Sequence, residues 1–538
     1  MSSERRFGRR SNGTATEPDK LRLRASCAPS PFPQRMGFRI TDPNTRLAIA
    51  ACDRAVLRTM IGRFAIDPFT TGLLATGLLL SGCATTRLPD LRQPDAATAW
   101  RNAPQAADAA PAPDLRSWWK AFNDAELDRL IEQALRDNLT IRQAVARIEG
   151  ARALAEHAYA GFLPQIGAHT YAEPTPDSSA SYFQMGFDAK WEFGLFGRGQ
   201  SQARITAGEL GIAESETQAA RVSVVAEVAK TYVELRGAQQ RLALMNEIVA
   251  AAQDKLVLTQ TRQRLRMAAA GDLDRARTEQ AAAEAALYEP RLAIERCRQQ
   301  LAVLLGRSQP ADDFIVPGTQ PQLGDLSIAS APADLLRTRP EIRRAENEVL
   351  KAAGELGIAR ADRLPRLGLG GSLTYAARVI GHTRLSDADG IVTFGPAIDI
   401  PLFDWGQRHA VADARESDLA ASVLAYRQAV LEGVAEAETA MASLEQQRQR
   451  RDALARGLAP LESGVETTAT LKRLGLADGF DRLTADGALL QARLDVAQAE
   501  QERNIAFIAL YKSLGGAPLP ATEPAVAAPG EARTGESP

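Results

Sequence analysis

The sequence predicts a mainly α-helical chain with a small β part, in which a pattern of helix, β-hairpin and long helical hairpin occurs twice. Three observations support this fold class. Apolar residues recur at helical spacing over most of the chain. In a few short stretches the spacing changes to strict alternation, which is typical of half-buried strands. The order of elements then repeats, since Pro365 follows Pro164 by 201 residues and Gly406 follows Gly197 by 209.

The N-terminal part contains a processing signal. Small residues precede one cysteine in Leu80-Ser81-Gly82-Cys83, directly after an apolar run too short to span a bilayer. This spacing resembles a bacterial lipobox and predicts a covalent diacylglycerol and an N-acyl lipid on Cys83. A signal peptide would then cover 60–82, and 1–59 would be a doubtful extension from an upstream start codon or a disordered basic arm. The alternative is a buried helix that happens to end in cysteine.

Composition excludes several classes of function. Residues 1–59 hold 12 Lys or Arg and 5 Asp or Glu, whereas the whole chain has a formal net charge of −2. The chain after Cys83 is therefore acidic, which argues against nucleic acid as a partner. Besides Cys83 and two cysteines in the extension, the sequence has only Cys297, so we expect no disulfide framework. The four histidines show no metal-binding or catalytic spacing, and we expect neither a metal, nor another cofactor, nor enzymatic activity.

The first copy of the pattern begins after a Pro- and Ala-rich tether. A helix is predicted from Asp124 to about Ala160, and Pro164 ends it. Alternation is strong from Tyr182 to Phe193 and weaker from Gln165 to Ala172, so the two stretches predict a hairpin. A helix from about 199 to 267 follows, on the order of 100 Å long, and a rod of this length needs helical partners. The chain turns near Gly271 and returns as a helix from 272 to about 305.

The second copy repeats these elements. A helix starts at Pro340, a favoured first-turn residue, and ends before Pro365. Two alternating stretches follow, over 367–375 and 392–402, although Pro396 and Pro401 are unusual in a strand. A long helix from about 407 to 474 turns at 475–479 and returns to Leu514.

These strands suggest how the chain meets a membrane. The chain after Cys83 has no apolar stretch of 18 residues, so any crossing of a bilayer would use β-strands. Each copy supplies two strands, and four strands cannot close a barrel. Three chains would supply twelve, with apolar side chains towards lipid and polar side chains towards water. Aromatic residues near the strand ends fit interfacial girdles, although ordinary packing would also explain them: Tyr171, Trp191, Phe193, Phe196, Phe403 and Trp405.

Six sequence segments in the right order carry a family resemblance. They are Trp118 to Leu127, Phe162 to Gln165, Trp191 to Arg198, Arg339 to Glu346, Pro401 to Gly406 and Ala509 to Gly516. With the duplication, the chain resembles the TolC-like outer membrane factor family, and within it the NodT-type efflux lipoproteins of resistance-nodulation-division systems. The resemblance implies a homotrimer with a 12-stranded β-barrel in the outer membrane, continued by an α-helical tunnel in the periplasm.

The resemblance also assigns roles at the two helical turns. They would form the periplasmic tip that contacts the adaptor (membrane fusion) protein, and through it an inner-membrane pump. The tip residues are Ala268, Ala269, Gly271, Gly475, Leu476 and Ala477. In the family, acidic residues beyond the second turn ring a closed aperture, which makes Asp481 a gate candidate, with Asp274 as the matching residue of the first tip. Both residues also fit a plainer role, an acid stabilised at a helix N-terminus.

The expected organisation follows from these assignments. The segments are 1–59, extension; 60–82, signal peptide; 83–117, lipidated tether; 118–305, first repeat; 306–332, linker; 333–516, second repeat; and 517–538, disordered tail. The expected function is a passive exit duct for small molecules or drugs in a tripartite efflux pump, lipid-anchored in the outer membrane. The alternatives are a duct for type I protein secretion and a periplasmic coiled-coil structural lipoprotein.

Overall fold

The computed structural model describes residues 88–89, 91, 100–102, 114–173, 182–310, 316–324, 339–378 and 390–519. The expected extension, the signal peptide and Cys83 lie outside these residues. So do most of the tether, much of the linker and nearly all of the tail.

The first repeat follows the predicted order, but its helices are interrupted where the pattern suggested continuous ones. A short 3₁₀ turn η1 (Trp118–Phe122) precedes α3 (Ala125–Asp137) and α4 (Leu139–Glu156). The break at Asn138 has a local cause, because the Asn138 side chain accepts hydrogen bonds from the backbone N–H groups of Thr140 and Ile141 and so starts a new helix. The remaining elements are η2 (Ala160–Phe162), β1 (Gln165–Glu173), β2 (Tyr182–Glu192), α5 (Arg198–Arg264), α6 (Asp272–Ala286) and α7 (Tyr288–Leu304).

The second repeat contains α9 (Pro340–Ala361), β3 (Arg366–Arg378), β4 (Gly390–Asp399), α10 (Gln407–Arg456), α11 (Leu458–Arg473) and α12 (Gly479–Ser513). The predicted helix over 407–474 is divided at Gly457. The predicted fourth strand ends at Asp399, so Ile400 and Leu402 lie beyond it. Pro396 lies in β4, which is an edge strand of the sheet in the single chain, the position at which a strand proline is usually found.

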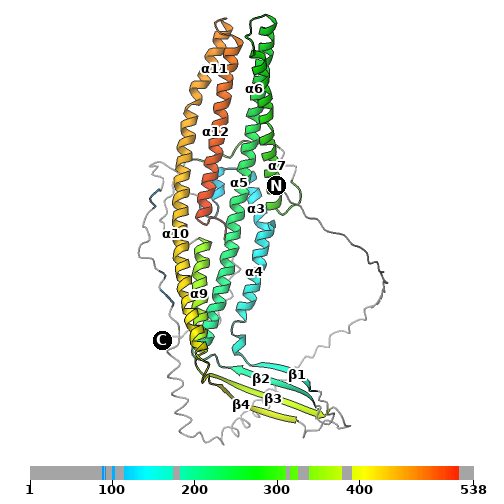
Figure 1. Ribbon diagram of the computed structural model, residues 1–538, viewed down its shortest axis with the longest axis vertical. Helices are drawn as coiled ribbons and strands as arrows, with labels where there is room; N and C mark the ends of the chain where they lie inside the picture. The colour runs from blue at the N-terminus through cyan, green and yellow to red at the C-terminus, as the bar shows by residue number, and fades with distance from the viewer. Residues whose placement is uncertain are drawn as a thin grey trace, which may run out of the picture. The chain divides into compact units, whose positions relative to one another are not determined.

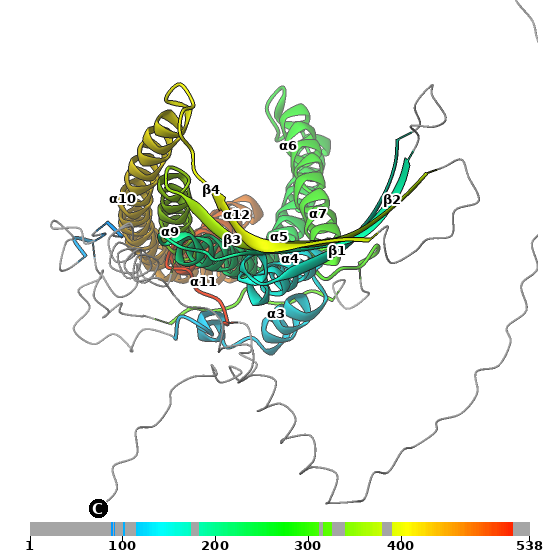
Figure 2. The same ribbon diagram turned by 90° about the horizontal axis from the view of Figure 1, so that it is seen from below.

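The four strands form one antiparallel sheet in the order β1-β2-β3-β4 (Figure 1), so β1 and β4 are its edges. The register keeps side chains of one kind in the same row. Phe187 of β2 lies opposite Ala168 of β1 and Leu373 of β3, and Leu373 lies opposite Val392 of β4. The alternate rows are mostly polar or glycine, with Ile391 and Ala397 of β4 as apolar members. Seen from below, the strands form a curved ribbon at one end of the helices (Figure 2). The sheet therefore has one apolar and one polar face, as the alternation predicted.

The two repeats interlock through their helices. Helix α5 of the first repeat packs along α9 and α12 of the second. Glycines permit the closest approach: a Cβ atom at Gly354 of α9 would lie 2.7 Å from the Ser201 carbonyl oxygen, and one at Gly208 of α5 would lie 2.8 Å from that of Asn347. The repeats consequently cannot act as separate domains.

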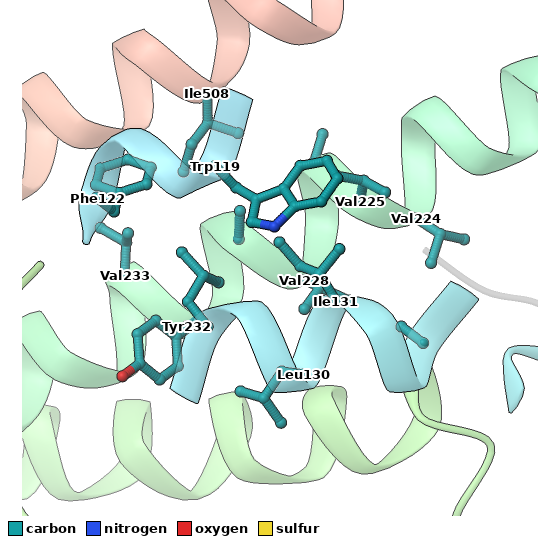
Figure 3. Close-up of a cluster of buried hydrophobic side chains, with 14 of the residues drawn as sticks. Trp119, Phe122, Leu130, Ile131, Val224, Val225, Val228, Tyr232, Val233 and Ile508 are labelled. Atoms are coloured by element: carbon teal, nitrogen blue, oxygen red, sulfur yellow. The ribbon is translucent and has the colours of Figure 1, made fainter. Parts of the chain in front are cut away.

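The main core joins the start of the first repeat to the end of the second. Side chains of η1, α3, α5 and α12 form a buried cluster (Figure 3), including Trp119, Phe122, Val228 and Ile508. Beside them, Trp118 is fully buried, stacks on Tyr511 at 5.7 Å between ring centroids, and donates its indole N–H to the Gly516 carbonyl oxygen at 3.0 Å. This cluster joins the middle of α5 to the C-terminal part of α12.

Within the described ranges, no helix combines the length and apolar character needed to cross a bilayer.

Candidate gate at the helical tips

The two helical turns lie at the end of the helices away from the sheet (Figure 1). Each turn follows a helix whose end is closed by a residue with positive φ: Arg266 (φ 59°) in the first turn and Gly475 (φ 73°) in the second. The next N–H bonds back to the helix in the same way, from Met267 to the Arg262 carbonyl and from Leu476 to the Leu471 carbonyl. These bonds make the two turns structurally equivalent.

This equivalence corrects the pairing of the tip acids. Asp481 accepts a hydrogen bond from the backbone N–H of Asp478 at 2.9 Å. In the first turn, the backbone N–H of Ala269 donates the equivalent hydrogen bond to the Asp272 side chain, at 2.8 Å. Asp272, not Asp274, is therefore the counterpart of Asp481. Sequence matching missed this because the first tip has an arginine, Arg266, where the second has a glycine.

The structure places both gate candidates on the surface. Asp274 is mostly exposed, and its described partner is Arg277 of the same helix, at 3.3 Å. Asp481 forms a capping box with Asp478, in which each side chain accepts the other residue's backbone N–H. In the single chain, Asp481 thus caps the start of α12. This is the plainer of the two roles that the sequence allowed, the other being a gate.

A contact between the two hairpins forms next to Asp481. The Asp478 side chain accepts from the backbone N–H groups of Phe480 at 2.7 Å and Asp481 at 3.0 Å, and it also forms an ion pair with Arg262 near the end of α5. The Arg262 guanidinium lies 4.1 Å from the centroid of the Phe480 ring, a cation–π geometry. We call Arg262, Asp478 and Phe480 the tip latch, because they join the second hairpin to the first.

Packing and charge support the tip latch. A Cβ atom at Gly479 would lie 2.9 Å from Leu258 Cδ1, so the start of α12 contacts α5 directly. Within the first hairpin, Lys255 of α5 pairs with Glu279 of α6 at 2.5 Å, which links the two arms of that hairpin. Hydrogen bonds from the Asp481 and Phe480 backbone N–H groups, with the nearby Arg262, hold the pKa of Asp478 below its ordinary value of 3.8. The carboxylate therefore stays ionised at neutral and mildly acidic pH.

The expected adaptor-contact residues surround this latch. Gly271 and Gly475 are exposed, as are the apolar side chains Leu265, Met267, Leu474 and Leu476. Exposed apolar side chains at a helical end indicate a contact surface for another protein. Sequence reasoning missed the latch because Arg262 and Asp478 are 216 residues apart.

The described residues include no group of three or more His, Cys, Asp or Glu side chains suited to a metal ion.

Comparisons with known proteins fit this architecture. The sequence profile of the outer membrane efflux protein family matches residues 130–307 and 331–516. Nodulation protein T of Rhizobium leguminosarum bv. trifolii is 26% identical over 74% of this chain and 87% of its own length. Outer membrane protein OprJ of Pseudomonas aeruginosa is 29% identical over 80% of this chain and 93% of its own length. The solved structure of the outer-membrane channel OprN superposes with a TM-score of 0.68 at 30% identity, over 81% of this chain and all of that one.

Proposed function

This chain belongs to the outer membrane efflux protein family, and we propose that it is the exit duct through which a tripartite efflux pump releases small molecules across the outer membrane. The family match across both repeats carries this proposal. The duct is a passive channel and not an enzyme. A coiled-coil rod would not need the sheet, whose two faces differ in polarity most clearly along β2.

The working unit is a homotrimer. In the single chain, the edge strands β1 and β4 have no described partner on their outer sides, and an open edge is not viable in lipid. The apolar face is also bare, with Val392 75% and Phe394 77% exposed. Pairing β4 of one copy with β1 of the next would continue the antiparallel order, and three copies would close a 12-stranded barrel that puts the apolar face in lipid.

The lipid anchor on Cys83 is consistent with the position of the described tether residues Leu88 and Leu91. Leu88 and Leu91 line a cleft with Val349 and Leu350 of α9. From Leu350 to the end of α9 beside the sheet is about 16 Å. Leu88 lies five positions after Cys83, and five residues span up to about 17 Å when extended. An acyl chain on Cys83 can thus reach the inner leaflet of the outer membrane next to the barrel.

The tether also contacts the second hairpin. Trp100 is buried against Met441 and Leu510, and the Glu438 carboxylate of α10 accepts the backbone N–H groups of Arg101 at 2.7 Å and Asn102 at 3.0 Å. We therefore assign 83–117 as the lipidated tether and 60–82 as the signal peptide, with 1–59 as a doubtful extension. The repeats are 118–305 and 333–516, joined by 306–332 and followed by a tail over 517–538.

The tips form the periplasmic entrance. The exposed turns around Gly271 and Gly475 contact the adaptor protein, and through it an inner-membrane pump of the resistance-nodulation-division class. Opening separates the hairpins and breaks the tip latch. Three copies of Asp481 near the threefold axis would place like charges close together and disfavour the passage of anions. Asp274 is the weaker gate candidate, since its equivalent position in the second tip is not acidic.

The test is the oligomeric state and conductance of the purified protein. In detergent we expect the mass of three chains, and in a planar bilayer discrete channel events. A monomer that forms no channels, under conditions in which a porin inserts, would overturn the proposal.

A further inference from the structure

Helices α9 and α10 of the second repeat lie side by side, and both reach the sheet (Figure 1). Arg363 lies between the end of α9 and the start of β3, and His409 lies in the first turn of α10. Their side chains are in contact, with Nη2 of Arg363 3.2 Å from Nε2 of His409. Because a guanidinium can only donate, Nε2 accepts this hydrogen bond and the ring proton lies on Nδ1. The imidazole thus orients the guanidinium at the junction of helix and sheet.

Arg363 has no carboxylate partner among the described residues. The nearby acids of α9, the loop after β4 and α10 are each engaged by another arginine. These pairs are Asp362 with Arg198 and Arg366, Asp404 with Arg408, and Glu416 with Arg360. Asp399, at the end of β4, and Asp413, one turn after His409, form no described ion pair with either group. Of the five N–H donors of Arg363, one is used on His409, and the other four have no described acceptor in the chain.

Arg363 is exposed although the elements on its two sides belong to the same chain. It directly precedes β3, an inner strand with β2 on one side and β4 on the other. Helix α9, which it follows, likewise packs between α5 and α10. Further copies in the proposed trimer would add to the edge strands β1 and β4, and not at this position. The guanidinium is therefore open to a partner from outside the protein.

The apolar face of the sheet continues into the loop that leads to α10. Beyond the end of β4, Leu402 and Trp405 are each 90% exposed and Phe403 is 74% exposed. The rings of Phe403 and Trp405 pack edge to face, with 4.8 Å between their centroids. Trp405 has a left-handed backbone (φ 56°), and the Asp404 side chain holds this turn by accepting backbone N–H groups on its far side. Exposed aromatic rings of this kind are enriched where the apolar core of a bilayer meets the headgroups.

We propose that Arg363 binds the phosphate of a phospholipid in the periplasmic leaflet of the outer membrane, while Phe403 and Trp405 contact the adjoining glycerol and acyl chains. This inference rests on the proposed duct, in which the apolar face of the sheet lies in lipid and the helices lie in the periplasm. An arginine directly beyond a lipid-facing surface is at headgroup depth, and the guanidinium fork matches the oxygens of a phosphate. His409 is a positioning residue, because it acts by orienting Arg363.

The experiment measures lipid binding to the purified mature protein in detergent by native mass spectrometry. Two probes with identical acyl chains are compared, phosphatidylglycerol, which has a phosphate, and diacylglycerol, which has none. We expect the wild type to bind phosphatidylglycerol more tightly, on the order of fivefold, from the contribution of one arginine beside an anionic headgroup. An excess of inorganic phosphate should not displace the phospholipid, because the soluble anion makes no contact with the aromatic residues.

Four variants separate this inference from other causes. Arg363→Gln should remove the preference for phosphatidylglycerol. Arg360→Gln is the matched control, since it removes the same charge three residues earlier on α9, from a guanidinium that pairs with Glu416 at 3.0 Å. It should keep the wild-type preference. His409→Leu should weaken the preference, and His409→Gln should retain it, because the amide oxygen can still accept a hydrogen bond from Arg363.

Equal binding of the two lipids by the wild type would overturn the inference, and so would a preference that survives in Arg363→Gln or is lost in Arg360→Gln. Displacement of the lipid by inorganic phosphate would overturn the assignment to a phospholipid and indicate a site for a soluble anion. Each of these results leaves the duct intact if the same preparation forms channels in a planar bilayer. A wild type that forms no channels would overturn the proposed function, and this inference with it.

Discussion

Replacing Arg262 by methionine should open the duct more often. The change keeps the apolar stem and removes the guanidinium that joins the hairpins. Two interactions disappear, the ion pair with Asp478 and the cation–π contact with Phe480. Both partners of the ion pair are close to half exposed, with side-chain accessibilities of 43% and 47%. Solvent screening therefore makes the ion pair the smaller contribution.

The cation–π contact sets the expected size of the shift in the closed-to-open equilibrium. Such a contact at an exposed site contributes about 0.5–1 kcal/mol. Losing it shifts the closed-to-open equilibrium by about two- to fivefold for each subunit. If the three subunits open together, the combined shift is about 10- to 150-fold, assuming that the contributions add.

Single-channel recording in a planar bilayer measures this shift as open probability. Arg264→Met is the matched control, because Arg264 lies one half-turn further along the same helix and its described side-chain contact is Thr261, also of α5. Open probability should rise in Arg262→Met and stay at the wild-type level in Arg264→Met. Equal behaviour of the two variants would refute the reasoning that the latch opposes opening.

Four further predictions follow from the same structure. Asp481→Asn should change open probability by less than about twofold if Asp481 only caps α12, since a neutral amide can still accept the Asp478 N–H; a larger increase in the same recordings would instead assign it to the gate. Lowering the pH from 7 to about 4.5 should not release the latch, because the pKa of Asp478 is depressed in the folded chain. The stabilising contribution of the Asp478 carboxylate is present above its ordinary pKa of 3.8 and is lost only as the pH falls through the still lower pKa of the folded state. Asp478-dependent opening above about pH 4 would contradict this. Trp118→Ala removes a fully buried side chain and its hydrogen bond to Gly516, so it should destabilise the fold by about 3–5 kcal/mol, seen as a lower Tm; an unchanged Tm would contradict the assigned core. Cys83→Ala should abolish labelling by radioactive palmitate while the barrel keeps the chain in the outer membrane fraction, and labelling that persists would exclude Cys83 as the acylated residue.

The strands were predictable from the sequence because their chemistry is local. Alternation over Tyr182–Phe193 predicted β2 and the face of each side chain, and a residue period of two leaves little freedom in the register of a sheet with one apolar face. The long helix over 199–267 was predictable for a similar reason. Its end at Arg264 differs by three residues, because a left-handed Arg266 closes it before the glycine-containing turn.

Helix breaks and long-range contacts were less predictable. Asn138 interrupts an apolar pattern that continues across it, because its side chain caps the following helix. Nothing in the local pattern of Arg262 distinguishes it from Arg264 beside it. Its pairing with Asp478 depends on how two hairpins from different repeats pack, and spacing along the chain carries no information about that.

The helical tips were predictable as a region, and the gate within them stays a prediction. The turn at Gly475 identified the tip, and Asp481 was found within it. Asp478, whose carboxylate joins three backbone and side-chain donors, was not singled out, although an aspartate directly before a helix is a common N-cap. The sequence can indicate that a residue caps a helix, but whether the same residue also contacts a second hairpin is decided by tertiary packing.

The most direct test of the duct is the conductance of the purified mature protein in a planar lipid bilayer. The account predicts discrete channel events from a trimer, with openings more frequent in Arg262→Met than in the wild type. Absence of channel events in the wild type and the variant alike, in bilayers where a known porin inserts, would contradict it.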